Sequence, residues 1–165
     1  MTDDATIELS RAELRAVAGY AAACARTALD IFERERPDDQ RPRAAIEAAQ
    51  AFAAGADRTK SIRDSAWAAQ RAAQEARDAG QVAASEAARA ALAAAGAAFL
   101  HPLAYAARAH ELVAGGDAAL GAGHIARSQR LASVVVVEVL KRYPLAPSGG
   151  GRAGELLRKL DALLR

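Results

Sequence analysis

Histidine and cysteine are the residue types in this chain that could supply a base, a nucleophile or a metal ligand, and they are few. The chain has three histidines, His101, His110 and His124, and one cysteine, Cys24. No two histidines have the four-residue spacing, with an intervening glutamate, that places two metal ligands on one helix face. No nucleophile elbow or phosphate-binding loop is present either. We therefore expect a protein that is not an enzyme and that holds no metal and no cofactor.

An enzyme that pairs the histidines with Glu111 or Asp117 is the alternative. The adjacent residues His110 and Glu111 disfavour it, because neighbouring side chains on a helix point apart. Cys24 falls on the apolar side of its predicted helix, where a cysteine behaves as a small hydrophobic residue.

Two arginines flank a proline in the sequence Arg41-Pro42-Arg43. Arg43 and Glu47 are four residues apart, so they can pair on the surface of a helix. Arg41 and Arg43 either form such solvated pairs or present a contact for an anion or an acidic partner. Both interpretations are open.

Trp67 lies on the polar side of its predicted helix. At about 100° per residue it stands about 140° from the apolar Ile62, among Asp64, Arg71 and Gln74. A large aromatic side chain at this position either packs under a neighbouring helix or is exposed. An exposed tryptophan would be a candidate for binding a partner, because tryptophan is enriched at binding hot spots.

A second group of residues could hold a small molecule instead. Phe52, Phe99, His101 and Tyr105 would line a groove between helices. Alanine-rich helices pack closely and leave few large cavities, which disfavours a roomy pocket.

Composition and charge exclude several classes of function. The 22 basic and 20 acidic residues nearly cancel, giving a net charge of +2, and they are interspersed, so we expect no nucleic-acid partner. No apolar stretch approaches the roughly 20 residues that span a bilayer, so we expect no membrane partner. The acidic start lacks an apolar signal core, and a single cysteine forms no internal disulfide. A cytoplasmic location is expected.

The secondary-structure elements that position these residues are all expected to be helices. Apolar residues recur at spacings of three and four, and 52% of residues are hydrophobic although only 4% are aromatic. Ser10 and Glu13 form a capping box, and Gly55 and Gly80 are helix stops. We expect an all-α, single-domain bundle of about six to seven helices, in which residues 8–143 form the alanine-rich helical bundle. The helices are predicted near residues 11–35, 42–54, 59–79, 81–101, 103–113 and 123–142, the last including a run of four valines buried on most sides.

The C-terminal residues form a separate unit. Residues 144–151 read as a flexible linker, and residues 152–165 as an amphipathic helix. A helix this short is marginal alone. Its leucines, Leu157, Leu160 and Leu164, are therefore expected to dock on the same chain or on another, which includes a possible homodimer.

Residues 39–52, Asp-Gln-Arg-Pro-Arg-Ala-Ala-Ile-Glu-Ala-Ala-Gln-Ala-Phe, resemble the signature of a bacterial helical family of immunity proteins. The capped first helix and the stretch Tyr105–Ala109 are similar as well, over about residues 8–113. The family usually has tryptophan at the position of Phe52, and often two histidines within the stretch Leu92–Gly96, where this chain has none. The resemblance implies an α-helical domain and toxin neutralisation.

We therefore expect a non-enzymatic interaction protein, immunity-like or an accessory subunit, that binds a toxin, an enzyme or itself. The residues expected to contact that partner are Trp67, Arg41, Arg43, Leu157, Leu160 and Leu164. The alternative is a small-molecule-binding or self-resistance accessory protein that uses Phe52, Phe99, His101 and Tyr105.

Overall fold

The chain folds as an all-α bundle. The computed structural model describes residues 9–99, 130–142, 148–149 and 151–165, and these residues contain helices and turns but no strand. The helices, in chain order, are α1 (Arg11–Glu35), α2 (Arg41–Ala53), α3 (Lys60–Asp78), α4 (Val82–Gly96), α7 (Val134–Lys141) and α8 (Gly151–Leu164). This confirms the predicted fold class.

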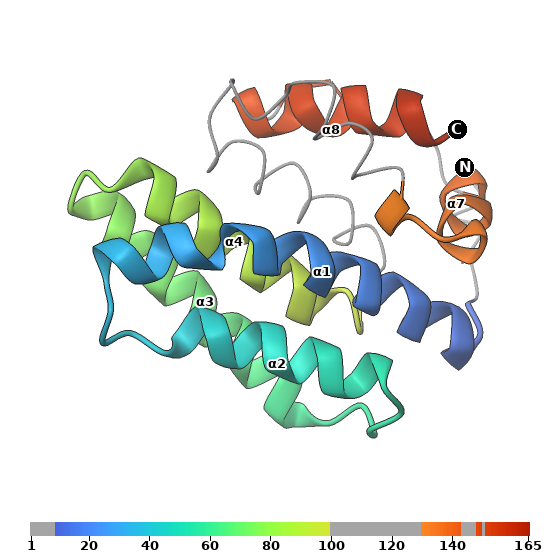
Figure 1. Cartoon of the computed structure of the whole chain (residues 1–165), viewed down its shortest axis with the longest axis horizontal. Coiled ribbons are helices and arrows are strands. Elements are labelled where there is room, and N and C mark those ends of the chain that lie inside the picture. Colours follow the sequence, from blue (N-terminus) through green and yellow to red (C-terminus); the bar gives the residue numbers. More distant parts are fainter. Residues whose placement is uncertain (1–8, 100–129, 143–147, 150) are drawn as a thin grey trace, which may run out of the picture.

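Helices α1 to α4 form the main packing unit (Figure 1). Helix α4 contacts α1, α2 and α3, and α2 also packs on α1 and α3. Helix α7 packs against α1, and α8 packs against α7. The outer faces of α2 and α3 therefore lie on the side of the molecule away from α8 (Figure 1).

The ends of α1, α2 and α3 follow from local sequence signals. Ser10 Oγ accepts a hydrogen bond from the backbone N–H of Glu13 at 3.1 Å, and Glu13 Oε2 accepts one from the N–H of Ser10 at 3.0 Å. This is the predicted capping box, which satisfies otherwise unpaired N–H groups at the start of the helix. Gly55 and Gly80 have φ values of +119° and +77°, a conformation that glycine adopts at little steric cost, so both residues end helices as predicted.

The core is built from small side chains. Eight alanines of α4 are buried, and Cys24 is fully buried among the apolar residues of α1, as predicted. Helices α1 and α2 approach so closely at Gly19 that a Cβ atom there would lie 3.3 Å from Ala53 Cβ. Phe32, Ile46 and Phe52 supply the large side chains.

The predicted helix over residues 123–142 is not continuous. Residues 130–131 are helical, but Ser133 has an extended backbone, and its Oγ accepts a hydrogen bond from the N–H of Val136 at 3.3 Å. The serine thus caps a new helix, α7, because its side chain replaces the missing partner of a first-turn N–H group.

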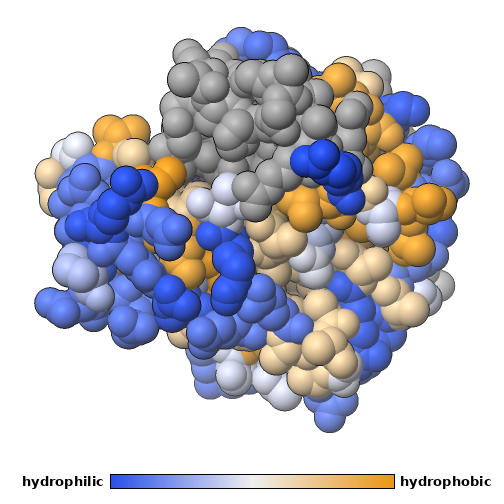
Figure 2. Space-filling view, in the orientation of Figure 1, coloured by the Kyte–Doolittle hydropathy of each residue, from blue (hydrophilic) through white to orange (hydrophobic). Residues whose placement is uncertain are grey.

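The burial expected for the valine run was wrong. Val136 is buried, but Val134 is 78% exposed and Val135 is 43% exposed. The two exposed valines occupy the first turn of α7, before the helix reaches the core. Apolar side chains gather accordingly at the right of the molecule, where α7 lies (Figure 2).

Several predictions concern residues outside the described part of the chain. They are the helix break at Pro102, the helix over residues 103–113, all three histidines, Tyr105, and linker residues 144–147 and Gly150.

Candidate functional site

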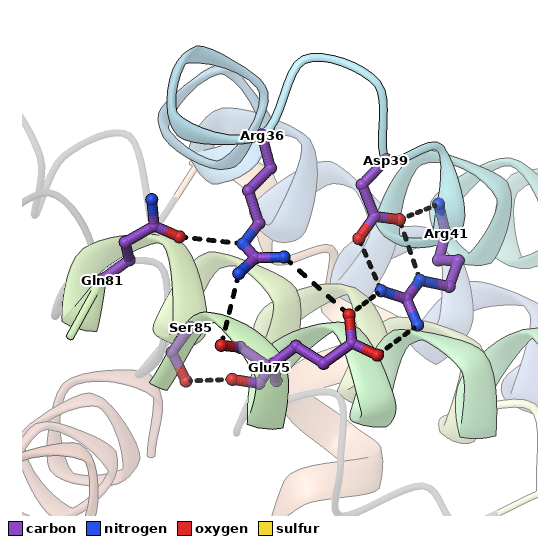
Figure 3. Close-up of polar contacts among 7 residues, drawn as sticks. Arg36, Asp39, Arg41, Glu75, Gln81 and Ser85 are labelled. Carbon is purple, nitrogen blue, oxygen red and sulfur yellow. Dashed lines mark hydrogen bonds and ion pairs between the residues drawn. The ribbon is translucent and has the colours of Figure 1, made fainter. Parts of the chain in front are cut away.

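One end of the bundle carries a cluster of charged side chains, which we call the Arg41 cluster: Arg36, Asp39, Arg41, Glu75 and Gln81 (Figure 3). Arg41 is the first residue of α2, and its guanidinium lies between two carboxylates. Its Nε and Nη2 donate to the two oxygens of Asp39 at 2.9 and 2.7 Å. Its Nη1 and Nη2 donate to the two oxygens of Glu75 at 3.2 and 2.6 Å. The guanidinium therefore joins the start of α2 to α3.

Arg36, which follows α1, extends the Arg41 cluster to the start of α4. Its Nε donates to Gln81 Oε1 at 2.8 Å, and its Nη2 donates to the backbone oxygen of Glu75 at 3.3 Å. Close by, the buried Ser85 of α4 donates from Oγ to the backbone oxygen of Ala73 at 2.9 Å (Figure 3). The C-terminal part of α3 is thus fixed to three other segments of the chain.

The charges of the Arg41 cluster reinforce one another. Hydrogen bonds from Arg41 lower the pKa of Asp39 and the pKa of Glu75, and the two carboxylates together raise the pKa of Arg41. All three groups are therefore charged at neutral pH. In this arrangement Arg41 already has carboxylate partners within its own chain, so a contact with an outside partner stays a prediction.

Arg43 also has an internal partner, but a different one from the residue expected. Its Nε and Nη2 donate to the two carboxylate oxygens of Glu33, on α1, at 2.7 and 2.9 Å. The expected pair with Glu47 lies along one helix, whereas Glu33 meets the guanidinium in a two-pronged geometry across the α1–α2 contact. Such bidentate pairs are the stronger kind. The pair also lowers the pKa of Glu33.

Trp67 is exposed, which decides between the two interpretations of this residue. Its relative exposure is 55%, the value of a side chain that lies on the surface of α3 rather than under another helix. An open groove of about 440 Å³ lies between α2 and α3, and Trp67 is not among the residues that line it. The groove is lined by Gln40, Arg41, Ala44, Ser61, Asp64, Ser65 and Ala68.

The residues of the alternative ligand groove do not all face an opening. Phe52 is 1% exposed, and the guanidinium of Arg15 lies 5.5 Å from its ring centre. Phe99 is half-buried beneath two guanidiniums, those of Arg58 and Arg63 at 5.3 and 4.7 Å. His101 and Tyr105 are outside the described residues, so the groove as a whole stays a prediction.

The tail helix α8 buries part of its apolar side in its own chain. Leu156 is 1% exposed, and Leu164 is 7% exposed within the main core, whereas Leu163 is 47% exposed. The side chains of Leu157 and Leu160 are outside the described part. Leu164 therefore contacts its own chain, and contact of the tail with another chain stays a prediction.

The part of the chain that the structure describes contains no group of three or more histidine, cysteine, aspartate or glutamate residues that could hold a metal ion. None of its helices is long and apolar enough to cross a membrane.

Sequence reasoning missed the arginines Arg63 and Arg77, which lie exposed on α3, Arg63 one turn before Trp67. The signal that could have found Arg63 is its spacing of four residues from Trp67, which places both on one face of the helix. That no carboxylate of the described residues pairs with Arg63 or Arg77 could not be read from the spacing.

Comparison with known proteins gives one match. The family model described as Imm-5 like putative immunity protein matches residues 8–133, more than half of the chain. This range includes α1 to α4 and reaches beyond residue 113, where the expected resemblance ended. No curated protein and no solved structure matches the chain.

Proposed function

The chain belongs to the Imm-5 like family of immunity proteins, and we propose that it neutralises a toxin protein by binding it, without catalysis. Trp67 is the central contact of this proposal. The toxin is a protein whose activity stops when this chain covers its surface.

The exposure of Trp67 is the observation that supports this proposal. More than half of a large indole surface faces water in a chain that has one tryptophan in all. Covering such a side chain removes apolar area from water and gives its N–H group a place to donate, which is why tryptophan dominates many protein interfaces.

The backbone beneath Trp67 is held firmly, which favours binding. The opposite side of α3 packs through Ile62, Ala69 and Ala73, which are at most 5% exposed. Glu75, two turns further along, is joined to Arg41 at 2.6 Å. A surface that is already ordered loses little conformational entropy when a partner binds.

The first test takes the toxin to be found among the products of the genes that neighbour the gene of this protein. Co-expression of the chain should restore growth of cells that produce the toxin, and the two purified proteins should form a complex. Trp67→Ala should weaken the complex about 30-fold, because a central tryptophan at an interface typically contributes 2 kcal/mol or more. Isothermal titration calorimetry measures the change.

The matched control is Val82→Ala, which removes another exposed apolar side chain, 64% exposed, at the start of α4. The affinity of this variant for the toxin should stay within about twofold of that of the unaltered chain. Growth arrest that persists in the presence of the folded chain would exclude neutralisation. Equal losses in the two variants would exclude Trp67 as the central contact.

A further inference from the structure

The charged residues of α3 are paired unequally. Each of its three carboxylates has a partner: Asp64 lies 3.8 Å from Lys60 Nζ, Glu75 2.6 Å from Arg41 Nη2, and Asp78 accepts from Gln74 Nε2 at 2.8 Å. Asp64 and Glu75 are therefore paired with cations, and Asp78 is hydrogen-bonded to a neutral amide.

The arginines of α3 are not compensated in this way. Among the described residues, no carboxylate lies within ion-pair distance of Arg63, Arg71 or Arg77, and all three side chains are exposed. The guanidinium of Arg63 lies 4.7 Å from the ring centre of Phe99. A ring face attracts the positive charge but leaves the guanidinium N–H groups without acceptors.

Arg63, Trp67 and Arg71 follow one another at intervals of four residues, so they form a continuous line on the exposed face of α3, which we call the α3 stripe. The stripe places one large aromatic side chain between two guanidiniums. A guanidinium binds a carboxylate through two parallel hydrogen bonds, and the indole covers apolar area between them.

We propose that the α3 stripe recognises an acidic protein surface, in which aspartate or glutamate carboxylates flank an apolar spot. The inference rests on the proposed function and adds the chemistry of the partner. The partner's carboxylates pair with Arg63 and Arg71, and its apolar side chains cover Trp67.

Charge favours a protein over a nucleic acid as this partner. Nucleic acids are bound by continuous basic tracks that neutralise many phosphates. Here Asp64, Glu75 and Asp78 are spaced along the same helix, and the net charge of the whole chain is only +2. Carboxylates that are spaced to meet two arginines fit this pattern better than a regular phosphate backbone does.

Fluorescence of the single tryptophan tests the proposal directly, because Trp67 lies within the stripe. The full chain is titrated with poly-L-glutamate and, separately, with a single-stranded oligonucleotide of equal charge. Poly-L-glutamate should shift the emission of Trp67 to shorter wavelength, because the methylene groups of its side chains cover part of the indole when its carboxylates pair with Arg63 and Arg71. Its affinity should fall about tenfold between low and high salt, because exposed charge pairs are screened. Unchanged emission, or tighter binding of the oligonucleotide, would overturn the proposal.

The double variant Arg63→Gln/Arg71→Gln should weaken poly-L-glutamate binding about tenfold. The variant Arg63→Lys/Arg71→Lys should lose less affinity, because lysine keeps the positive charge although it lacks the paired N–H donors of a guanidinium. Glutamine has a helix propensity close to that of arginine, so the fold is kept. The control Arg11→Gln/Arg26→Gln removes the same charge from exposed positions on α1. If the control loses as much affinity as the stripe variant, the effect depends on net charge alone and the inference is refuted.

A neutralisation assay with the toxin distinguishes failure of this inference from failure of the proposed function. If the Arg63→Gln/Arg71→Gln variant neutralises the toxin as well as the unaltered chain does, and salt has no effect on the complex, neutralisation stands and the acidic partner surface is refuted. If poly-L-glutamate binds the stripe but the unaltered chain does not neutralise the toxin, the proposed function fails and the specificity of the stripe for carboxylates is retained.

Discussion

Asp39 and Glu75 share the guanidinium of Arg41, and the protonation of these two carboxyl groups is therefore coupled to unfolding. Hydrogen bonds from Arg41 lower the pKa of both carboxyl groups in the folded chain. A group with a lowered folded pKa binds its proton more readily when the chain is unfolded. Its stabilising contribution is complete above the unfolded pKa, about 4, and is lost as the pH falls through the lower folded value.

We therefore expect the free energy of unfolding, measured by urea denaturation with circular dichroism, to be nearly constant from pH 7 to about pH 5 and to fall below about pH 4. In the Arg41→Gln variant the fall should be smaller, because Asp39 and Glu75 lose the partner that lowers their pKa values. Lys60→Gln serves as the control, since its 3.8 Å pair with Asp64 is highly exposed and should contribute little. Identical acid dependence in the Arg41→Gln variant and the unaltered chain would contradict the assigned origin of the shifts.

At the level of elements, the approach of α1 to α2 depends on one residue without a side chain. A Cβ atom at Gly19 would already lie 3.3 Å from Ala53 Cβ, closer than ordinary van der Waals contact. A side chain at this position crowds Ala53, so α2 must shift away from α1 to admit it. Because Arg43 and Glu33 pair across the same contact, separation of the helices would strain that ion pair too.

Gly19→Leu is therefore expected to destabilise the chain by about 1–3 kcal/mol through overpacking, in spite of the better helix propensity of leucine. Thermal and urea unfolding measure this loss. Ala83→Leu, at an exposed position of α4, adds the bulk of a leucine side chain without a neighbouring helix and should change stability by less than about 0.5 kcal/mol. A neutral Gly19→Leu variant would show that the α1–α2 contact can open without cost.

At the scale of the whole molecule, the core extends beyond the family match. The match ends at residue 133, one residue before α7 begins. Yet Val136, Val139 and Leu140 of α7 are at most 5% exposed and belong to the same core as α1, α2 and α4. Arg142, just after α7, also donates to Glu13 Oε1 at 2.7 Å, next to the capping box of α1. Helix α7 therefore completes the packing of the matched region.

Leu140→Ala should accordingly cost about 2–5 kcal/mol of stability, as for other buried leucines that leave a cavity. Val134→Ala on the same helix removes a side chain that is 78% exposed and should change stability by less than about 0.5 kcal/mol. Chemical denaturation of both variants makes the comparison. If the two substitutions change stability equally, α7 does not contribute to the core.

The sequence alone determined the helices whose ends are signalled by neighbouring residues. The capping box of Ser10 and Glu13 starts α1, Gly55 and Gly80 end helices, and Cys24 is buried, all as predicted. These features are local: a cap is a hydrogen bond across three residues, and helical periodicity is visible within a few turns. The cap at Ser133 is local too, but the helical pattern on both sides of it concealed the break.

Tertiary structure decided which faces meet and which charges pair. Glu33 rather than Glu47 became the partner of Arg43, because α1 and α2 bring residues ten apart in sequence together. Trp67 is exposed because no described helix covers that side of α3, and Phe52 is buried because α1 lies over it. Periodicity defines the sides of one helix, but only the packing of several helices determines which of those sides remain in water.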